Sequence, residues 1–248
     1  MSGHSKWSTI KRKKGANDAK RGKLFTKLIK EITVAARLGG GDEESNPRLR
    51  QAVLAAKGAN MPADNIKRAI QKGTGELPGI SYEEALFEGY GPGGIAVMVD
   101  VTTANRKRTV AELRHLIGKY GGNLGESGCV AWMFEKKGMI IVEKDGPDEE
   151  VLLELIVKGG GDDFNDEGDV YTVYSAPENM PSVINSVEGG GGTIRSSEVL
   201  QLPANLVAIE GETARKVLQL MEALDDHDDV QRVSANFEID DEKLETVD

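Results

Sequence analysis

The chain has 248 residues, of which 39% are hydrophobic and 29% are charged, and its formal net charge is −10. This length and composition are typical of a globular protein of two or three domains, and the lack of any apolar run of about 18–20 residues excludes a membrane-spanning helix. A single cysteine excludes an intrachain disulfide framework or a multi-cysteine metal site, and the lysine-rich start lacks the apolar segment of a secretory signal, so we expect a cytoplasmic protein with no membrane partner.

The charge is divided unevenly along the chain. Residues 1–76 contain 17 Lys and Arg against 7 Asp and Glu, a net charge of +10, whereas the remaining residues carry −20. Segments of opposite sign indicate a polyanion-binding module joined to an acidic body. The alternative is that the charge only keeps each part in solution.

The first predicted elements are a basic arm and three helices. Residues 1–17 offer little apolar surface, so we expect this arm to be weakly ordered when free. A helix is predicted from Asp18, a second one follows the N-cap Asn46, and a third runs from Pro62 to Gly73. In the first helix, one set of residues at helical spacing faces a core and another faces away: Leu24, Leu28, Ile29, Ile32 and Ala36 face inward, and Lys23, Lys27, Lys30 and Glu31 face outward.

Strands and helices alternate from residue 80 onward. Alternating or β-branched segments predict strands at 95–101, 128–134, 139–144, 170–175, 193–202, 205–209 and 230–239, with a weaker strand near 163–164. Apolar residues at helical spacing predict intervening helices within 110–120, 151–156, 180–187 and 214–224.

The order of these elements predicts an α+β fold. Residues 139–202 supply β-α-β-β-α-β, which is the ferredoxin-like order, and the flanking elements supply the same unit cut in half. We therefore predict an N-terminal three-helix domain followed by two ferredoxin-like α+β domains, one inserted in the other. The predicted boundaries are 1–76 for the basic arm and helical domain, 80–136 plus 204–248 for the split α+β domain, and 137–203 for the inserted α+β domain.

Several motifs that resemble catalytic or metal sites are better explained as structure. The G-x-G-x-x-G match at 89–94 precedes a predicted strand instead of a phosphate-binding helix, which favours a strand-to-strand turn. The segment 162–169 lacks the twelfth-position carboxylate of a calcium loop, and the segment 225–229 (DDHDD) is interpreted as a solvated helix end. Neither His115 nor Cys129 has a catalytic partner in view. No catalytic residue, metal site or cofactor is predicted.

The basic N-terminal stretch is the predicted nucleic-acid site. Eight cations lie within 18 residues, and cations that neutralise phosphates release bound counterions, which favours binding to DNA or RNA. Trp7 adds a flat ring that could stack on an unpaired base, or could instead anchor the arm to the helical domain. The predicted nucleic-acid-binding residues are Lys6, Trp7, Lys11, Arg12, Lys13, Lys14, Lys20, Arg21, Lys23 and Lys27. A smaller cluster at a helix start is a candidate second patch: Arg106, Lys107 and Arg108.

Long segments of the sequence resemble the YebC family of bacterial and organellar proteins. These segments are GHSKWSTIKRKKGANDAKRGKLFTKLIKEI, NPRLRQAV, NMPADNIKRAIQKG, FEGYGPGG, NRKRTVAELRH and GGNLGESGCVAWMF, and they extend over essentially the whole chain. The resemblance implies a helical domain followed by two α+β domains, no catalytic activity and no cofactor. Because it starts at Gly3, without room for a transit peptide, it points to a bacterial cytoplasmic member.

The resemblance implies two roles. Some members of the family are described as DNA-binding transcriptional regulators, and others, including mitochondrial translational activators, act on the ribosome and help synthesis through proline-rich stretches. We therefore predict a non-enzymatic nucleic-acid-binding regulator of gene expression, in its leading form a transcriptional regulator on DNA. One alternative is a ribosome-associated translation factor on ribosomal RNA. Another is a protein–protein adaptor; in either case the acidic α+β domains would contact the ribosome or other proteins.

Overall fold

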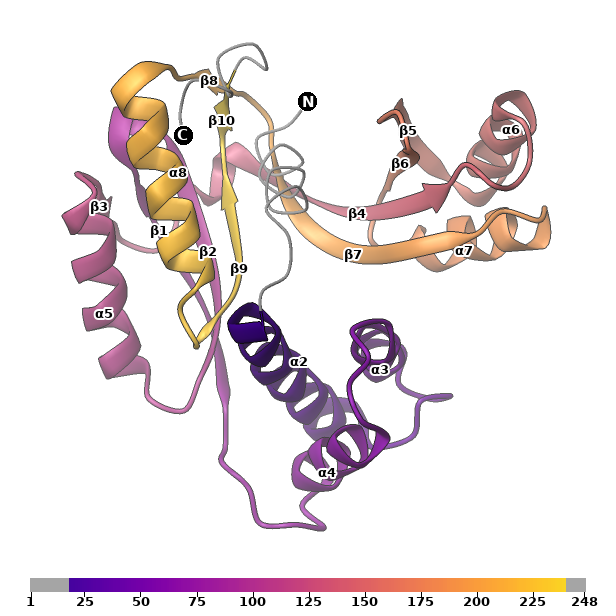
Figure 1. The fold of residues 1–248 in the computed structure, drawn as a ribbon, viewed down its shortest axis with the longest axis horizontal. Helices are drawn as coiled ribbons and strands as arrows, with labels where there is room; N and C mark the ends of the chain where they lie inside the picture. Colours follow the sequence, from indigo (N-terminus) through magenta and orange to yellow (C-terminus); the bar gives the residue numbers. More distant parts are fainter. Residues whose placement is uncertain (1–17, 240–248) are drawn as a thin grey trace. The chain divides into compact units, whose positions relative to one another are not determined.

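The structure is a computed structural model that describes residues 18–239, so the predicted arm lies outside it. The described chain forms two compact units, one made of 18–133 and 203–239 and the other of 134–202 (Figure 1). Where the first unit is interrupted, the carbonyl oxygen of Met133 accepts a hydrogen bond from the amide of Ala204 at 2.8 Å. The three-domain boundaries given above stay a prediction.

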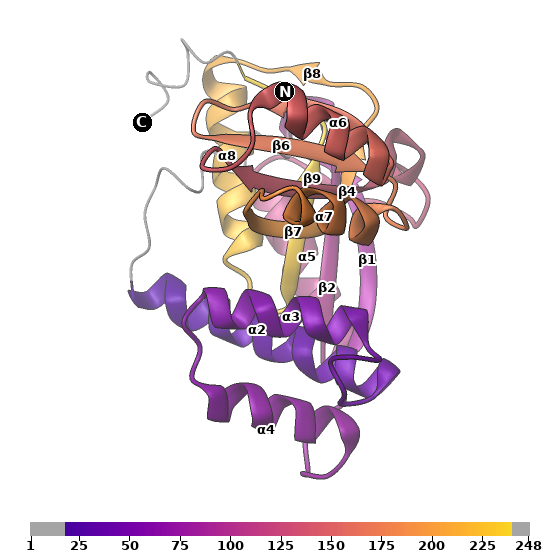
Figure 2. The ribbon, with the colours of Figure 1, turned by 90° about the vertical axis from the view of Figure 1, so that its right-hand side faces the viewer.

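The helical region, residues 18–74, contains three helices that lie alongside one another in Figure 2. They are α2 (Asp18–Gly39), α3 (Pro47–Gly58) and α4 (Ala63–Thr74). They share a core of buried apolar side chains that includes Ile32, Ala35, Leu49, Val53, Ile66 and Ala69. The inward positions predicted for Ile32 and Ala36 are confirmed, but the side chain of Leu24 is 45% exposed, so its predicted place in the core is wrong. Leu24 lies in the first two turns of α2, N-terminal to the part of the helix that packs on α3 and α4.

Close contacts fix the angles between these helices. A Cβ atom at Gly73 would collide with the carbonyl oxygen of Thr33, so α4 approaches α2 closely only because residue 73 is glycine. The hydroxyl of Thr33 donates to the carbonyl oxygen of Ala69 at 3.3 Å. Asn46 caps α3, since its Oδ1 accepts from the amide of Leu49 at 3.1 Å, and its amide nitrogen donates to two carbonyl oxygens of the α2 end at 2.8 Å.

The first unit also contains a four-stranded antiparallel sheet of order β3-β1-β2-β9. Its strands are β1 (Glu83–Tyr90), β2 (Ala96–Thr103), β3 (Asn123–Leu124) and β9 (Val230–Ala235). Helices α5 (Arg106–Lys119) and α8 (Gly211–Asp225) lie on the same side of this sheet in Figure 1 and share its apolar core. Two short strands, β8 (Val207–Ala208) and β10 (Phe237–Glu238), pair in parallel.

The second unit has the β-α-β-β-α-β order. It consists of β4 (Phe134–Glu143), α6 (Glu149–Gly159), β5 (Gly161–Asp166), β6 (Val170–Ser175), α7 (Met180–Gly189) and β7 (Ile194–Pro203). The sheet order β5-β6-β4-β7 is that of a ferredoxin-like fold, and both helices pack on one face. The α+β fold class is confirmed, and so is the weak strand predicted near 163–164.

The strand predicted at 128–134 is wrong. Residues 131–133 form a short 3-10 helix, η2 (Ala131–Met133), and the strand β4 begins only at Phe134. The reason is the carboxylate of Glu88, which accepts hydrogen bonds from the amides of Gly128, Val130 and Ala131 at 2.7–2.9 Å. These amides are therefore withdrawn from any strand ladder.

Strand β1, at the start of the sheet, is not predicted by the sequence pattern, and neither is the short strand β3. Strand β1 contains acidic residues at 83, 84 and 88, which are unfavourable in strands. The turn predicted at 89–94 is confirmed: it contains η1 (Pro92–Gly94) and connects β1 to β2. Of the helices described, none is long and apolar enough to cross a membrane.

Candidate nucleic-acid interface

Most of the predicted nucleic-acid site lies at or beyond the edge of the described residues. Six of its members lie outside them: Lys6, Trp7, Lys11, Arg12, Lys13 and Lys14. Lys20 is in α2, but its side chain also lies outside the described part. The remaining three, Arg21, Lys23 and Lys27, are placed on the first turns of α2. The guanidinium of Arg21 lies over the ring of Phe25, at 5.5 Å from the ring centre.

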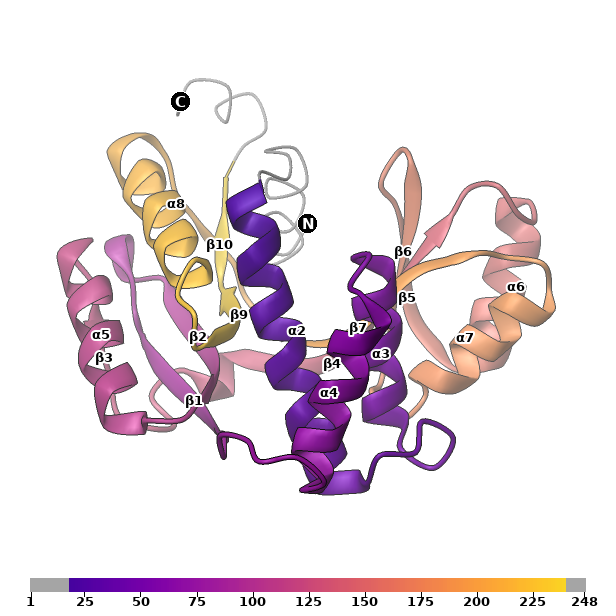
Figure 3. The ribbon, with the colours of Figure 1, turned by 60° about the horizontal axis from the view of Figure 1, so that its bottom comes forward.

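Three lysines form one face of α2, because Lys23, Lys27 and Lys30 are spaced by four and three residues. This basic face of α2 contacts the acidic turn, which we define as residues 225–229 between α8 and β9 (Figure 3). Lys23 lies 3.3 Å from the carboxylate of Asp226. Lys27 donates to the carbonyl oxygen of Asp225 at 2.6 Å and lies 3.3 Å from its carboxylate. The acidic turn therefore neutralises cations that the sequence assigns to nucleic acid.

Lys30 is the innermost member of this face. It is 6% exposed, and its prediction as an outward-facing residue is wrong. Its Nζ donates to Oδ1 of Asp229 at 2.7 Å, to the carbonyl oxygen of Asp228 at 2.8 Å and to that of Thr102 at 3.3 Å. It also lies 5.6 Å from the centre of the Tyr82 ring. All three ammonium protons thus have acceptors, as a buried lysine requires.

The second carboxylate oxygen of Asp229 is equally well bound. Oδ2 accepts from the guanidinium of Arg108 at 2.6 Å, from the hydroxyl of Thr109 at 2.8 Å and from that of Thr103 at 3.1 Å. Burial raises the pKa of Asp229, but the hydrogen bonds from Lys30, Thr109 and Arg108 outweigh it and hold the pKa well below its usual range. Asp229 is 3% exposed, so the interpretation of 225–229 as a solvated helix end is wrong at this residue.

One group beside this carboxylate has the composition of a metal site. Glu112, His227 and Asp229 offer ligand atoms within 4.8 Å of one another. However, Nδ1 of His227 accepts from the amide of Asp229 at 3.1 Å, which leaves Nε2 to donate to Glu112 at 3.0 Å. Because both oxygens of Asp229 are also engaged, these residues are explained by internal hydrogen bonds and do not fit a bound cation.

The candidate second patch is distributed over different contacts. Arg106 lies over the ring of Phe87 at 5.5 Å, and Lys107 is exposed. Arg108 is joined to Asp229, which raises the pKa of its guanidinium. The helix start itself is as predicted, since the side chain of Asn105 caps α5 by accepting from the amide of Arg108 at 3.1 Å. A role for these three cations in nucleic-acid binding stays a prediction.

A second ion-pair cluster joins the helical region to the sheet. The guanidinium of Arg48 in α3 donates to Glu31 of α2 at 2.7 and 3.1 Å and to Glu84 of β1 at 3.1 Å. The hydrogen bond from Arg48 lowers the pKa of Glu84. The apolar core of the helical region and that of the sheet are separate clusters. Ion pairs and hydrogen bonds therefore have a large share in fixing the helical region on the sheet.

Some cations of the helical region are not used in these clusters. They are exposed residues of α3 and α4, namely Arg50, Lys67, Arg68 and Lys72. Sequence reasoning missed them because they are scattered among apolar and polar residues and do not form a run. The signal that finds them is helical spacing, since residues four apart lie on one face of a helix.

The fold and this interface define an α+β protein in which a basic helical region is joined to an antiparallel sheet by ion pairs, of which Lys30–Asp229 is buried. Family models described as the "TACO1/YebC protein N-terminal domain" and the "TACO1/YebC second and third domain" match residues 5–76 and 82–237. The chain therefore belongs to the TACO1/YebC family.

Curated relatives and a crystal structure agree with this family. A "Probable transcriptional regulatory protein" of Desulforapulum autotrophicum is 55% identical over 98% of each chain. One of the same name from Pelotomaculum thermopropionicum is 56% identical over 97% of this chain and 100% of its own. The crystal structure of a conserved hypothetical protein from Aquifex aeolicus is 51% identical, with a TM-score of 0.84 over 92% of this chain and 94% of its own.

Proposed function

We propose that this protein is a non-enzymatic, nucleic-acid-binding regulator of gene expression, and that it acts as a transcriptional regulator on DNA. The observation that carries the proposal is the net charge of +10 on residues 1–76, next to −20 on the rest of the chain. A polyanion is attracted to the first part and repelled by the second, so its contacts are confined to the N-terminal third. The two relatives named above are each described as a probable transcriptional regulatory protein, which supports the same role.

The proposed DNA contacts are those of the basic arm and of the start of α2. If about six of these cations neutralise phosphates, the logarithm of the binding constant falls with the logarithm of salt concentration at a slope near −5. In this structure Lys23 contacts Asp226 and Lys27 contacts Asp225. These two lysines therefore bind DNA phosphates only after they release the carboxylates of the acidic turn.

The alternative functions differ in the polymer or partner that the same cations contact. A ribosome-associated translation factor uses them on ribosomal RNA, whose backbone carries the same charges. An adaptor protein uses them on acidic proteins. The transcriptional and the translational function predict the same dependence of binding on salt. Both also predict direct binding to a purified polynucleotide, which the adaptor function does not.

The test is a binding titration on promoter-containing duplex DNA, in parallel with co-sedimentation of the full chain with ribosomes at moderate salt. The variant replaces Lys11, Arg12, Lys13 and Lys14 together by Ala. A charge-matched control replaces four exposed cations of the acidic part by Ala: Lys136, Lys158, Arg215 and Lys216. We expect the first variant to lose DNA affinity and the control to keep it.

Three outcomes contradict the proposal in different ways. Co-migration with ribosomes and no sequence preference on DNA would replace the transcriptional role by the translational one. Full affinity of the Lys11/Arg12/Lys13/Lys14 variant for both polymers would favour the adaptor. Equal losses in the variant and in the charge-matched control would show that only the net charge of the chain matters.

A further inference from the structure

The exposed side of α4 carries three cations which, unlike the lysines on the basic face of α2, do not contact a carboxylate of the described residues. Lys67, Arg68 and Lys72 are all exposed, and within residues 18–239 no ion pair or side-chain hydrogen bond engages them. The only acidic residue of α4 is Asp64, in its first turn. The buried residues Ile66 and Ala69 face the helical core instead. One side of α4 is therefore fixed by packing, and the other presents positive charge to solvent.

The spacing of these cations suits a phosphate backbone. A helix rises about 1.5 Å per residue, so the Cα atoms of Arg68 and Lys72 are about 6 Å apart along the axis. Two steps along one strand of duplex DNA cover about 6.8 Å. Arg68 and Lys72 are also an unfavourable like-charge pair in the free helix, four residues apart. A row of phosphates relieves this repulsion.

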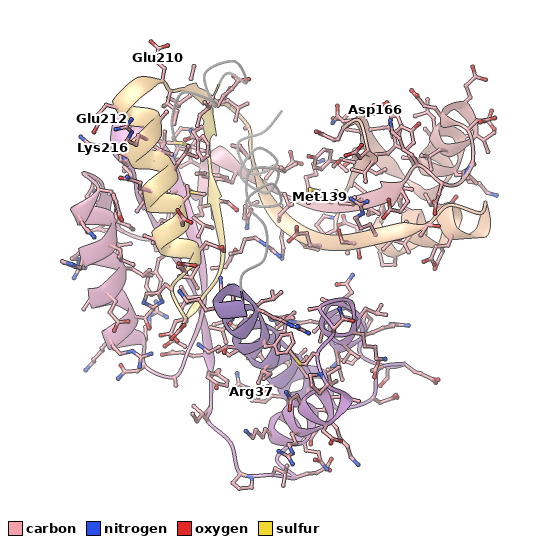
Figure 4. All side chains as sticks on the ribbon, viewed as in Figure 1. Arg37, Met139, Asp166, Glu210, Glu212 and Lys216 are labelled. Carbon is pink, nitrogen blue, oxygen red and sulfur yellow. The ribbon has the colours of Figure 1, made fainter. Side chains whose placement is uncertain are left out.

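A pocket extends the cationic side of α4 toward α2. It has a volume of about 300 Å³, and its lining includes Arg37 of α2, Lys72, and residues 75 and 77–82 of the connection to β1. Arg37, labelled in Figure 4, donates to the hydroxyl of Ser81 at 3.0 Å. The connection lies close to α4, since a Cβ at Gly79 would come within 3.1 Å of the side chain of Lys72. Arg37 and Lys72 are thus held at one opening.

The basic face of α2 offers the matched contrast. Lys23 and Lys27 are four residues apart, like Arg68 and Lys72, but Lys23, Lys27 and the neighbouring Lys30 each already contact a carboxylate of the acidic turn. A polyanion has to displace these carboxylates before it binds there. The cations of α4 bind phosphates without breaking any described ion pair, which makes α4 the more favourable contact in this conformation.

We propose that the exposed side of α4, formed by Lys67, Arg68 and Lys72 together with Arg37, binds the phosphate backbone of duplex DNA. This inference rests on the proposed function and adds a contact surface to it. The surface contacts phosphates and not base edges, since cations that neutralise the backbone carry no sequence information themselves. Its contribution to affinity is therefore the same on every DNA sequence.

The test compares the full chain with the double variant Arg68→Gln and Lys72→Gln. The control, Arg215→Gln and Lys216→Gln on α8, removes the same charge from exposed positions; there Lys216 lies 3.8 Å from Glu212 (Figure 4). The readout is the binding constant for two unrelated DNA duplexes between 50 and 200 mM salt. Loss of two phosphate contacts makes the slope of log K against log salt less negative by about 1.8 and lowers affinity at least about tenfold at the low-salt end.

Each outcome decides the matter. The inference holds if the α4 variant shows the smaller slope on both duplexes, the α8 control keeps the original slope, and circular dichroism shows that both variants fold. It is overturned if wild type binds DNA and the α4 variant keeps the wild-type slope, which leaves the proposed function intact. Wild type that binds only RNA overturns the assignment to duplex DNA, and wild type that binds neither polymer removes the proposed function itself.

Discussion

The ammonium group of Lys30 lies 2.7 Å from the carboxylate of Asp229, although 199 residues separate the two along the chain. Both side chains are almost fully buried, and each has further hydrogen-bond partners. A buried ion pair gains little over two apolar residues of the same shape, but the removal of one partner leaves an uncompensated charge. The pair therefore specifies where α2 lies on the sheet more than it adds to total stability.

Replacing Asp229 by Ala is expected to destabilise the protein strongly. The change leaves the buried ammonium of Lys30 without its carboxylate and removes the acceptor that Thr103, Thr109 and Arg108 share, at a cost of about 3–5 kcal/mol in the free energy of unfolding. Urea denaturation measures this cost. The control is Asp226→Ala, whose partner Lys23 is exposed, and here we expect a change below about 1 kcal/mol. Similar midpoints for the two variants would contradict the role given to Asp229.

The same carboxylate predicts a dependence of stability on pH. The pKa of Asp229 is depressed in the folded protein, whereas an unfolded chain has an aspartate pKa of about 3.9. The unfolded state therefore binds the proton first, and the contribution of Asp229 is complete above about pH 5 and falls as the pH drops through 4 and below.

The measurement is urea denaturation of wild type and Asp229→Asn from pH 7 to pH 3. We expect the difference in free energy of unfolding between them to be constant down to about pH 5 and to shrink at lower pH. Subtracting the variant removes the effect of other carboxylates with lowered pKa values, such as Glu84 and Glu88. A difference that stays constant to pH 3 would contradict the depressed pKa.

The sequence was sufficient for elements whose side chains follow a local period, and insufficient for contacts between distant segments. Helices α2–α4 and the order of the second unit follow from apolar spacing, strand alternation and local cap or breaker residues. Lys30 was missed because its outward position on α2 faces Asp229 of another element instead of water. The segment 128–134 has strand-forming residues, but Glu88, 40 or more residues earlier, binds its amides. Long-range partners of this kind leave no local pattern.

Glycine 73 provides a test of the packing between α2 and α4. We expect Gly73→Ala to lower the free energy of unfolding by about 1–3 kcal/mol, because the new methyl group meets the backbone of Thr33. The control is Gly58→Ala on α3, where a Cβ meets nothing within 4 Å. There the same substitution is expected to be neutral or stabilising by up to about 1 kcal/mol. Thermal unfolding followed by circular dichroism compares the two, and equal effects would contradict the close approach.

The carboxylate of Glu88 controls the thiol of Cys129. Burial and then the charge of Glu88 raise the pKa of Cys129, and the same carboxylate binds the amides on either side of this residue. Glu88→Gln removes the charge and weakens the loop, so we expect faster alkylation of Cys129 and a lower pH midpoint of its rate. Glu126→Gln removes a weaker charge effect and no loop hydrogen bond, so it should leave the rate nearly unchanged. An unchanged rate in Glu88→Gln would contradict this role.

The acidic turn is expected to compete with DNA for the basic face of α2, if the proposed function is correct. Asp225→Asn together with Asp226→Asn weakens the contacts of Lys27 and Lys23. We expect tighter DNA binding, with a salt slope more negative by up to about 1.8, since two further cations can reach phosphates. A control for net charge is Asp162→Asn with Asp163→Asn in β5. Equal gains in both variants would indicate a general effect of charge.

The main chain leaves the first unit after Met133 and returns to it at residue 203. The hydrogen bond between Met133 and Ala204 holds these two points next to each other. Unit 134–202 has its own core and its own sheet. If residues 134–202 were deleted, a tight turn could connect Met133 to residue 203. Another domain could be inserted at the same place. Evolution or protein engineering can therefore replace residues 134–202 by another domain while the first unit keeps its fold.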